Sequence, residues 1–275
     1  MPADSALAQR LAVYSSVLVG YSGGVDSALV AVVARRVLGP ARMLAVLGVS
    51  PSLSAAQRRQ ARAVARRFDV PLEEVATDEL ADPGYAANAP TRCFFCKREL
   101  WARLGALAET RGFAVVVDGT NRDDAGQHRP GRAAGAGAGV RSPLLEAGYA
   151  KDDVRREARL LGIPIWDAPA APCLASRLTY GLEVTPARLR QVEGAEHALR
   201  TLGIAGELRV RHGGNEARIE VRPDQVELVR RARATVVERL LALGFGRVTL
   251  DRGGYRRGSL LDRRAPDVEL LGERA

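Results

Sequence analysis

The segment SGGVDS, residues 22–27, constrains the fold of this chain more than any other part of its sequence. It follows an apolar run at residues 16–20 and precedes residues 28–38, which are rich in helix-forming side chains. Gly23 and Gly24 let the backbone curl so that successive N–H groups converge, and the N-terminus of the helix adds partial positive charge. The sequence therefore predicts a strand, a phosphate-binding turn and a helix in succession.

Polar side chains of the same segment suit a nucleotide. Ser22 and Ser27 can donate hydroxyl hydrogen bonds, and Asp26 can hold the Mg²⁺ that accompanies ATP. An ordinary glycine turn with a Ser or Asp cap is the alternative. The segment resembles the signature of the PP-loop ATP pyrophosphatases and lacks the GxxxxGK[ST] pattern of a Walker A loop. This resemblance implies that the loop grips the β and γ phosphates of ATP, so that the α–β bond breaks and the substrate is left carrying AMP.

The alternation of strand and helix recurs along the first two thirds of the chain. Further strands are expected at residues 43–49, 72–76 and 113–117, and helices at 54–68 and 98–110. This alternation predicts an α/β fold with a doubly wound, mainly parallel sheet covered on both faces. Ligands bind such sheets at the carboxyl ends of the strands. The PP-loop resemblance implies the same fold, that of the adenine nucleotide alpha hydrolase-like proteins.

The pattern of elements changes after about residue 175. Shorter strands are expected at residues 208–212, 217–221 and 247–251, with a long helix at 223–243. This order predicts a smaller C-terminal α+β domain. We therefore expect a PP-loop domain at residues 1–175, a small domain for substrate binding or oligomerisation at 176–262, and a flexible tail at 263–275. The glycine-rich segment 131–139 is expected to be a mobile connection.

A second polar segment follows the strand expected at residues 113–117. It contains Asp118, Gly119, Asn121, Asp123 and Asp124. Because it comes at a strand end, we expect it at the same edge of the sheet as the phosphate turn, where it can line a nucleotide pocket. An Asx-type turn is the alternative. Arg141 can reach the α-phosphate, where charge develops, although in this chain an arginine can equally be exposed to solvent.

The chain contains three cysteines, Cys93, Cys96 and Cys173. A CxxC pair lets two thiolates reach one metal, although alone it also fits a redox pair or half of a zinc site. A zinc finger would need a second nearby pair, which the sequence lacks. Three thiolates bind three corners of a cubane and leave the fourth iron open, so a 4Fe-4S cluster fits this set. Three unrelated buried cysteines are the alternative.

Arginines of the small domain form a third candidate group. Arg209 and Arg211 alternate along one expected strand and therefore share a face of the sheet. Two guanidinium groups on one face can clamp a phosphate, and Arg256 lies in a further basic segment. Glu220 on the next strand can be a salt-bridge partner. Arginines without a ligand are the alternative in so basic a chain.

The formal net charge of +9 raises the question of nucleic acid. All but two of the 41 basic residues are arginine, and a compositional bias explains that pattern without RNA. The sequence has no signal-peptide pattern and no apolar run of about 18 residues. We therefore expect a cytoplasmic protein that does not bind membranes, and we do not expect a nucleic acid as its partner.

Six motifs in order resemble the ATP-dependent sacrificial sulfur transferase (LarE) family across nearly the whole chain. They are SGGVDS, NAPTRCFFCKREL, DGTNRDDAGQHRPG, APCLASR, LRVRH followed by ARIEV, and VTLDRGGYRRGS. The resemblance implies a role in making the nickel-pincer nucleotide cofactor of lactate racemase and related enzymes. In that family ATP adenylates a carboxylate of pyridinium-3,5-biscarboxylic acid mononucleotide, and sulfur displaces AMP to give a thiocarboxylate.

The resemblance also implies roles for individual residues. Cys173 is the sulfur-bearing residue of catalysis, acting with Asp26 and Ser27 of the phosphate turn. The substrate phosphate is held by Arg209, Arg211 and Arg256. In the single-cysteine branch of the family the cysteine gives up its own sulfur and becomes dehydroalanine.

The pair Cys93 and Cys96 instead resembles the three-cysteine branch, in which a 4Fe-4S cluster can hold an extra sulfide on its open iron. Cys173 then serves mainly as a ligand, and turnover repeats when sulfide or another sulfur donor is resupplied. The family resemblance further implies a homo-oligomer.

Two other functions stay open at this point. A PP-loop tRNA thiolation enzyme can also combine a CxxC pair with a distant cysteine, but the sequence lacks an aromatic-interleaved basic tract for stacking bases. A nucleotide-binding sensor without catalysis is the alternative from another class. Release of pyrophosphate in the presence of substrate distinguishes an enzyme from a sensor.

Overall fold

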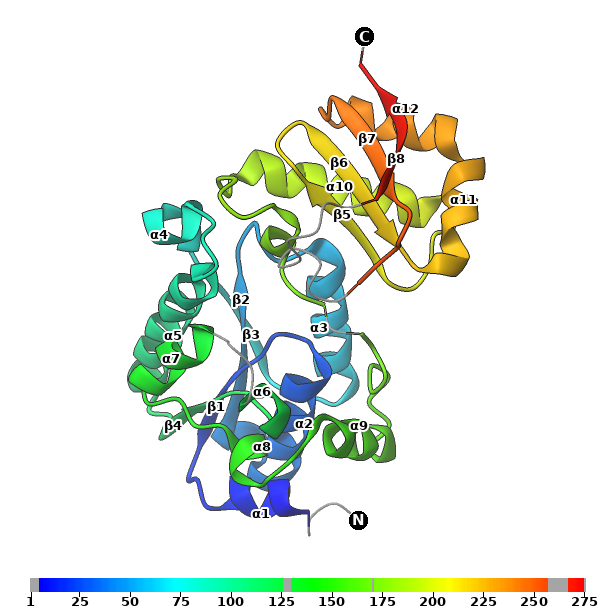
Figure 1. The fold of residues 1–275 in the computed structure, drawn as a ribbon. Helices are drawn as coiled ribbons and strands as arrows, with labels where there is room; N and C mark the ends of the chain where they lie inside the picture. Colours follow the sequence, from blue (N-terminus) through cyan, green and yellow to red (C-terminus); the bar gives the residue numbers. More distant parts are fainter. Residues whose placement is uncertain (1–4, 126–129, 170, 257–266, 275) are drawn as a thin grey trace. The chain divides into compact units, whose positions relative to one another are not determined.

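The computed structural model describes residues 5–125, 130–169, 171–256 and 267–274. The chain divides into two compact units (Figure 1). The first unit comprises Met1–Tyr85 and Thr91–Ala171, and the second comprises Ala86–Pro90 and Pro172–Ala275.

The first unit is built on a four-stranded parallel sheet. Its strands are β1 (Val17–Gly20), β2 (Met43–Val49), β3 (Leu72–Ala76) and β4 (Val115–Val117), in the order β3-β2-β1-β4. Val17 of β1 pairs with Met43 on one side and with Val115 on the other, so β1 is an inner strand. The doubly wound parallel sheet predicted from the sequence is confirmed.

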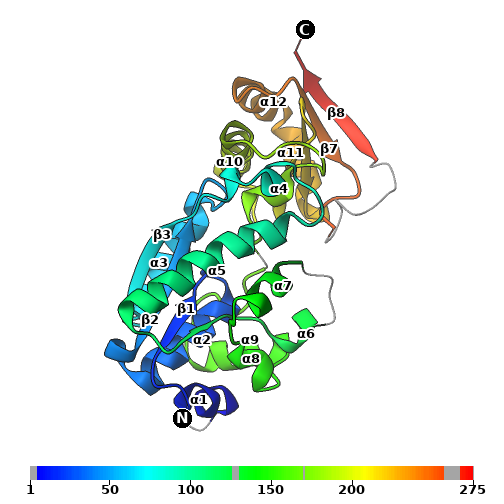
Figure 2. The same ribbon diagram turned by 90° about the vertical axis from the view of Figure 1, so that its left-hand side faces the viewer.

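Helices cover both faces of this sheet. They are α1 (Ala6–Ala12), α2 (Val25–Leu38), α3 (Ala55–Arg67), α4 (Pro83–Ala86), α5 (Arg92–Arg111), α6 (Arg122–Ala125), α7 (Pro130–Gly137), α8 (Pro143–Glu146) and α9 (Lys151–Leu160), with short 3₁₀ turns at Pro40–Arg42 and Glu79–Ala81. Figure 1 shows α2, α3 and α9 on one side and α5 with α7 on the other, and Figure 2 shows α5 running across its face of the sheet.

Alternation along β1 explains this layering. Val17 and Val19 are fully buried in a core shared with α1, α2, α3 and α9. Leu18 points to the opposite face, where it packs in a second cluster with Trp101 and Leu104 of α5. A strand that is apolar on both faces belongs in the interior of a parallel sheet.

The second unit contains a four-stranded mixed sheet. Its strands are β5 (Leu208–His212), β6 (Glu216–Val221), β7 (Arg247–Asp251) and β8 (Val268–Glu273), in the order β5-β6-β7-β8. The β6–β7 pair is parallel, and the other two pairs are antiparallel. The remaining elements are α10 (Pro186–Thr201), α11 (Val226–Arg231), α12 (Arg233–Ala242), and the 3₁₀ turns η4 (Leu174–Arg177) and η5 (Pro223–Gln225). The expected small α+β domain is therefore present.

The two faces of this second sheet differ in character. Leu208 and Val210 point into a core with residues of α10, α11 and α12. Arg209 and Arg211, one position along in each case, lie on the opposite face beside Glu220 and Arg218 of β6. Charged side chains therefore line one face of the sheet, and most of them are buried.

The short segment Ala86–Pro90 belongs to the second unit because of Asn88. This residue is fully buried, and its side-chain amide donates to the carbonyl oxygens of Thr179 at 2.8 Å and Leu182 at 2.9 Å. The backbone N–H of Val184 donates to the carbonyl oxygen of Ala86. These bonds tie the segment to the chain that follows η4.

Three expectations about the connecting segments were wrong. Residues 130–137 form helix α7 instead of a mobile connection, because small residues let it pack closely on α5: a Cβ at Gly135 would come within 3.2 Å of Trp101 Nε1. Residues 268–273 form β8 instead of part of a flexible tail, and Leu271 is buried in the core of the second unit. The long helix expected at 223–243 is divided into η5, α11 and α12.

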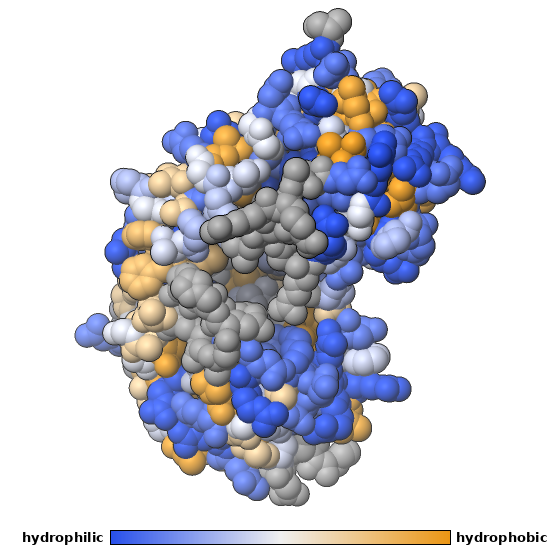
Figure 3. Space-filling view, viewed as in Figure 1, coloured by the Kyte–Doolittle hydropathy of each residue, from blue (hydrophilic) through white to orange (hydrophobic). Residues whose placement is uncertain are grey.

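The surface is mixed in polarity. Figure 3 shows hydrophobic residues scattered among hydrophilic ones on the face drawn. No helix in the described part of the chain is long and apolar enough to span a membrane.

Candidate active site

The phosphate turn predicted at residues 22–27 joins β1 to α2. Ser27 Oγ accepts a hydrogen bond from the N–H of Ser22 and donates to the carbonyl oxygen of Gly24, both at 3.1 Å. The two serine hydroxyls lie 3.1 Å apart. Helix α2 begins after Gly24, which has no side chain to cap it, so the N–H groups of its first turn need an acceptor from elsewhere. An anion such as a phosphate can provide one.

Glycines are required in this turn by close packing. Gly23 has a φ of +73°, and a Cβ there would lie 2.6 Å from Cβ of Ala61 in α3. A Cβ at Gly119, in the loop after β4, would come within 2.7 Å of the backbone nitrogen of Ser27. The structure thus brings the two predicted loops, at 22–27 and 118–121, into direct contact at one edge of the sheet.

Asp26 is the point where these loops meet. Its Oδ1 accepts from Nδ2 of Asn121 at 2.9 Å, and its Oδ2 accepts from Nζ of Lys151 at 2.5 Å. Lys151 begins helix α9, and its backbone N–H is held by Asp123 Oδ2 at 2.9 Å. A carboxylate, an amide and an ammonium group therefore converge beside the phosphate turn.

The loop after β4 is organised by its own side chains. Asp118 accepts from the Thr120 N–H and hydroxyl and from the Ser142 hydroxyl, at 2.7–3.0 Å. The Asn121 side chain is buried, and its Oδ1 accepts from the N–H groups of Asp123 and Asp124. Asp118 and Asn121 thus form local turns of the Asx type, as the alternative interpretation expected. Asn121 also bonds to Asp26 of the phosphate turn.

Arg141 is engaged with Glu146. Its Nε donates to Glu146 Oε1 at 2.7 Å, and Arg10 and Tyr14 bond to the other carboxylate oxygen. Partial burial alone would raise the pKa of Glu146, but hydrogen bonds and charge from Arg141 and Arg10 outweigh it and hold that pKa at about 2. Contact of Arg141 with an α-phosphate stays a prediction.

The CxxC pair lies in the first two turns of α5. Cys93 is exposed and Cys96 is half-buried, and residues three apart on a helix share a face, so both thiols can reach one centre. Helix α7 crosses the first of these turns, since a Cβ at Gly131 would lie 3.2 Å from the Cys93 carbonyl oxygen. Within the described residues, no group of three or more His, Cys, Asp or Glu side chains is placed to hold a metal ion. The donor chemistry of the pair suits a metal, and the three-cysteine set stays a prediction.

Cys173 belongs to the second unit and precedes the 3₁₀ turn η4. Its carbonyl oxygen accepts from the N–H and hydroxyl of Ser176 and from Nη1 of Arg177. Arg177 is buried and forms an ion pair with Glu196 of α10 at 2.9 Å. The residue predicted to carry sulfur therefore stands on a segment held by buried polar contacts.

The three arginines of the predicted phosphate clamp, Arg209, Arg211 and Arg256, differ in their burial and in their partners. Arg209 is buried, and its guanidinium lies 5.4 Å from the ring centre of Tyr255; burial lowers its pKa, and the charge of Arg177 lowers it further. Arg211 forms an ion pair with the fully buried Glu220 at 2.9 Å. Arg256 is half exposed, 3.7 Å from the buried carboxylate of Asp251. Arg209 and Arg211 share a face as expected, and phosphate binding by the three arginines stays a prediction.

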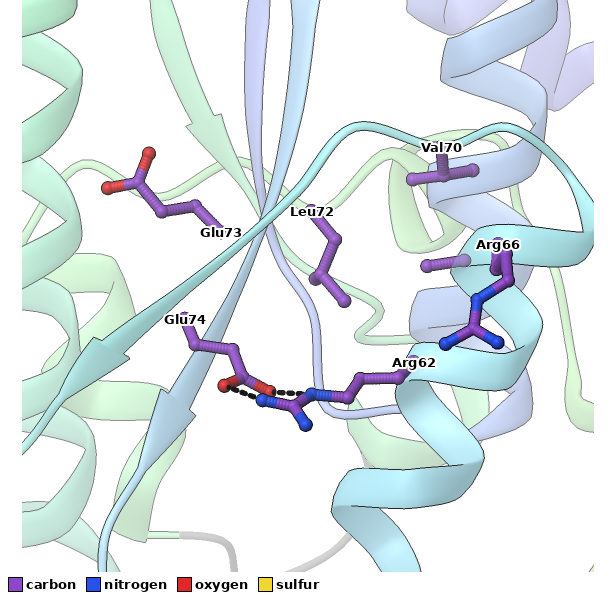
Figure 4. Close-up of a pocket in the computed structure, with 7 residues that line it drawn as sticks. Arg62, Arg66, Val70, Leu72, Glu73 and Glu74 are labelled. Carbon is purple, nitrogen blue, oxygen red and sulfur yellow. Dashed lines mark hydrogen bonds and ion pairs between the residues drawn. The ribbon is translucent and has the colours of Figure 1, made fainter.

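A hollow of about 540 Å³ lies elsewhere in the first unit, between α3 and the start of β3. Figure 4 shows Arg62 reaching across it to Glu74. Hydrogen bonds from Arg58 and Arg62 hold the pKa of Glu74 at about 2. The hollow is thus bridged by an ion pair of its own, and it borders neither the phosphate turn nor the loop after β4.

Sequence reasoning missed several polar residues at these sites. Lys151, Arg177 and Glu196 were given no role, although Arg177 stands in the quoted APCLASR motif. Lys151 had one available signal, because lysine is so rare in this chain. Glu196 had none, since a single glutamate on a helix is ordinary in sequence.

The first unit has the defining features of a PP-loop ATP pyrophosphatase. Its parallel sheet carries the SGGVDS turn after an inner strand, and polar side chains reach that turn from the loop after β4. The sequence model of the NAD synthase family matches residues 6–107, which cover this turn. The protein is therefore an ATP-using enzyme of the PP-loop class.

Comparison with known proteins identifies the family. The chain is 35% identical to pyridinium-3,5-bisthiocarboxylic acid mononucleotide synthase of Lactiplantibacillus plantarum, over 90% of this chain and 89% of that protein. It is 45% identical to an uncharacterised protein of Synechocystis sp. over 88% of this chain and 91% of the other, and 28% identical to one of Methanocaldococcus jannaschii over 87% and 90%. The chain belongs to the LarE family, and this membership supports sulfur transfer in cofactor biosynthesis.

Proposed function

We propose that this protein is an ATP-dependent sulfur transferase acting on pyridinium-3,5-biscarboxylic acid mononucleotide. A carboxylate oxygen of the substrate attacks the α-phosphorus of ATP, and pyrophosphate leaves. A sulfur nucleophile then attacks the acyl carbon, AMP leaves, and a thiocarboxylate remains for the nickel-pincer nucleotide. The convergence of Asn121 and Lys151 on Asp26 beside the SGGVDS turn carries the proposal, because it joins the two loops that the family motif predicts at one site.

The chemistry explains why ATP is needed. A carboxylate is a poor electrophile because oxide or hydroxide would have to leave, whereas an acyl adenylate offers a stabilised phosphate leaving group. The N–H groups at the start of α2 stabilise charge on pyrophosphate, and Asp26 supplies a carboxylate oxygen for the accompanying Mg²⁺. Lys151 then turns its ammonium group from Asp26 to a phosphate oxygen.

The residues of the second unit serve the substrate and the sulfur in this proposal. Arg209, Arg211 and Arg256 hold the mononucleotide phosphate, and Cys173 delivers or holds the sulfur. Cys93, Cys96 and Cys173 are the thiolates that would bind a 4Fe-4S cluster, and the shared helical face of the first two supports this assignment. Such a cluster, when bound, supplies an open iron on which sulfide can be held.

Substitution of the phosphate turn tests the proposal. Asp26→Asn and Ser27→Ala should abolish release of pyrophosphate from ATP in the presence of the mononucleotide, while the melting temperature stays close to that of the wild type. Asp152→Asn, an exposed carboxylate on α9, is the matched control and should retain activity. Undiminished pyrophosphate release by both turn variants would contradict the assignment of residues 22–27 as the ATP-binding turn.

A further inference from the structure

We propose that Arg177 is a positioning residue for the sulfur of Cys173, acting through the peptide groups on both sides of that cysteine. The inference rests on the proposed function only in assigning sulfur delivery to Cys173. The side chain of Arg177 does not itself have to touch a reactant.

One guanidinium nitrogen holds two successive carbonyl groups. Nη1 of Arg177 donates to the carbonyl oxygen of Pro172 at 2.5 Å and to that of Cys173 at 3.0 Å, and it lies 3.1 Å from Ser176 Oγ. The first carbonyl belongs to the peptide plane before the Cys173 Cα, and the second belongs to the plane after it. Since peptide groups are planar, fixing both planes fixes the direction of the Cα–Cβ bond and leaves χ1 as the freedom of the sulfur.

The guanidinium group is itself fixed from the interior. Nε of Arg177 lies 2.9 Å from Glu196 Oε1, and Nη2 lies 3.2 Å from Oε2, so the pair is bidentate. Glu196 Oε1 also accepts from the N–H of Val210 in β5 at 3.3 Å. Arg177 is 5% exposed and Glu196 8%, so little solvent competes for these bonds. These bonds therefore fix the backbone at Cys173 relative to α10 and β5, two elements of the packed core.

A second arginine ties the other end of the same segment. Nη1 of Arg211 donates to the carbonyl oxygen of Ser176 at 2.9 Å, while its Nε is bonded to Glu220. Ser176 in turn donates to the Cys173 carbonyl from its N–H at 3.0 Å and from its hydroxyl at 2.7 Å. Residues 172–177 are therefore attached to the sheet at both ends.

Rigid placement matters because sulfur transfer needs a close and aligned approach. A misplacement of about 1 Å in a reacting group can cost about 100-fold in rate. Pro172 is exposed and Cys173 is half exposed, so packing alone gives this part of the segment little support. Lysine cannot replace Arg177, because it lacks the planar fork that reaches Glu196 and both carbonyl groups together.

The test compares Arg177→Lys with Arg200→Lys, an exposed arginine on the same helix as Glu196. We expect amide hydrogen exchange at Ser176 and Leu178 to become at least about tenfold faster in Arg177→Lys and to stay unchanged in the control. The kcat of sulfur transfer should fall about 100-fold with unchanged KM for ATP and mononucleotide, while the first equivalent of pyrophosphate is released normally. If Arg177→Lys does not fold, the double variant Arg177→Met with Glu196→Met removes both charges together, and the same changes are expected of it.

Two outcomes would overturn the inference. One is wild-type exchange at residues 172–178 together with wild-type transfer, and the other is lost transfer without any change in exchange, which would indicate direct contact of Arg177 with a reactant. The exchange measurement needs neither ATP nor substrate. A wild-type protein that transfers no sulfur, but whose Arg177→Lys variant still exchanges faster, would therefore contradict the proposed function and leave the positioning role standing.

Discussion

Asp26 has both of its carboxylate oxygens engaged, one by a neutral amide and one by a cation. Asn121 comes from the loop after β4 and Lys151 from the start of α9, so three segments distant in sequence meet at this side chain. The carboxylate is about one quarter exposed, and solvent or a ligand can therefore reach it. In the proposed reaction Asp26 exchanges the ammonium group for Mg²⁺, and Lys151 becomes available to a phosphate.

Replacing Lys151 tests this exchange. Lys151→Met should lower the rate of pyrophosphate release about 10- to 150-fold, because one charge-assisted hydrogen bond is worth about 1.5–3 kcal/mol. The measurement is the ATP-dependent rate at saturating mononucleotide. Arg156→Met on the exposed side of the same helix removes a cation at the surface and should have no effect. Equal rates for the two variants would exclude Lys151 from the phosphate site.

Arg209 offers a comparable test in the second unit. Arg209→Ala should weaken binding of the mononucleotide about 10- to 150-fold and leave ATP binding unchanged, as measured by calorimetry with each ligand. Arg222→Ala, which removes an exposed partner of Asp224, is the control. Arg211→Ala is less selective, since Arg211 also holds the Ser176 carbonyl. Equal small effects on both ligands would mean that Arg209 does not bind the substrate phosphate.

At the scale of elements, local periodicity predicted the strands well and the helix boundaries less well. Strands β2 and β3 occupy the residues expected from their apolar runs. Helix α5 begins at Arg92, six residues before the expected start, because the aromatic residues of the CxxC segment pack into the fold: a Cβ at Gly84 would come within 2.4 Å of the Phe95 ring. Such tertiary contacts have no signature in local sequence.

Dependence on tertiary contacts also explains why local sequence did not predict β8 or the meeting of Asp26 with Lys151. Residues 268–273 (VELLGE) show no regular apolar alternation when read alone, and they become a strand because β7 offers an edge to pair with. Asp26 and Ser22 could be found from a contiguous motif. The meeting of Asp26 with Lys151, 125 positions away, could not, because it depends on where α9 packs against α2.

Strand β5 ends in a histidine that gives the fold a pH dependence. His212 is 1% exposed, its Nδ1 accepts from the N–H of Gly214 at 3.2 Å, and its Nε2 lies 2.9 Å from Gln191 Oε1. Burial, and then the charge of Arg188, lowers its pKa from 6.5 to about 4. The neutral ring with its proton on Nε2 satisfies both bonds, whereas a protonated Nδ1 could not accept from Gly214.

Stability should therefore fall on mild acidification. Because the unfolded chain takes up the proton first, the free energy of unfolding is unaffected well above pH 6.5 and decreases as the pH falls toward 4. Between pH 7 and pH 5 we expect a loss of about 2 kcal/mol from this group, measured by urea unfolding. His212→Asn should remove most of that difference. An NMR titration placing the His212 pKa above 6 would contradict the assignment.

For the whole molecule, the positive net charge is distributed through ion clusters as well as over the surface. Pairs of arginines share single carboxylates at several places among the described residues, for example Arg58 and Arg62 at Glu74, Arg10 and Arg141 at Glu146, and Arg211 and Arg218 at Glu220. Arg10, Arg58, Arg62 and Arg218 are held in these ion pairs and therefore contribute less to a basic surface that could attract nucleic acid. The substrate of the proposed function is likewise a small mononucleotide, which needs no extended basic surface.

The number of sulfur atoms that one chain transfers decides between the two proposed mechanisms. If Cys173 gives up its own sulfur, each chain acts once, and Cys173 loses the mass of hydrogen sulfide. If Cys93, Cys96 and Cys173 hold a cluster, sulfide replaces the transferred atom, and each chain acts repeatedly. We expect repeated turnover, because the CxxC pair shares one helical face and completes a three-thiolate set that leaves an iron open.

Anaerobically purified protein should therefore contain about four irons per chain and form more than one thiocarboxylate per chain when sulfide is supplied. Substituting any one of the three cysteines with alanine should lose the iron and the repeated turnover. A single turnover by iron-free protein, with dehydroalanine at position 173, would establish the sacrificial mechanism instead. Both mechanisms need the Cys173 sulfur in place, so Cys173→Ala with undiminished sulfur transfer would contradict both.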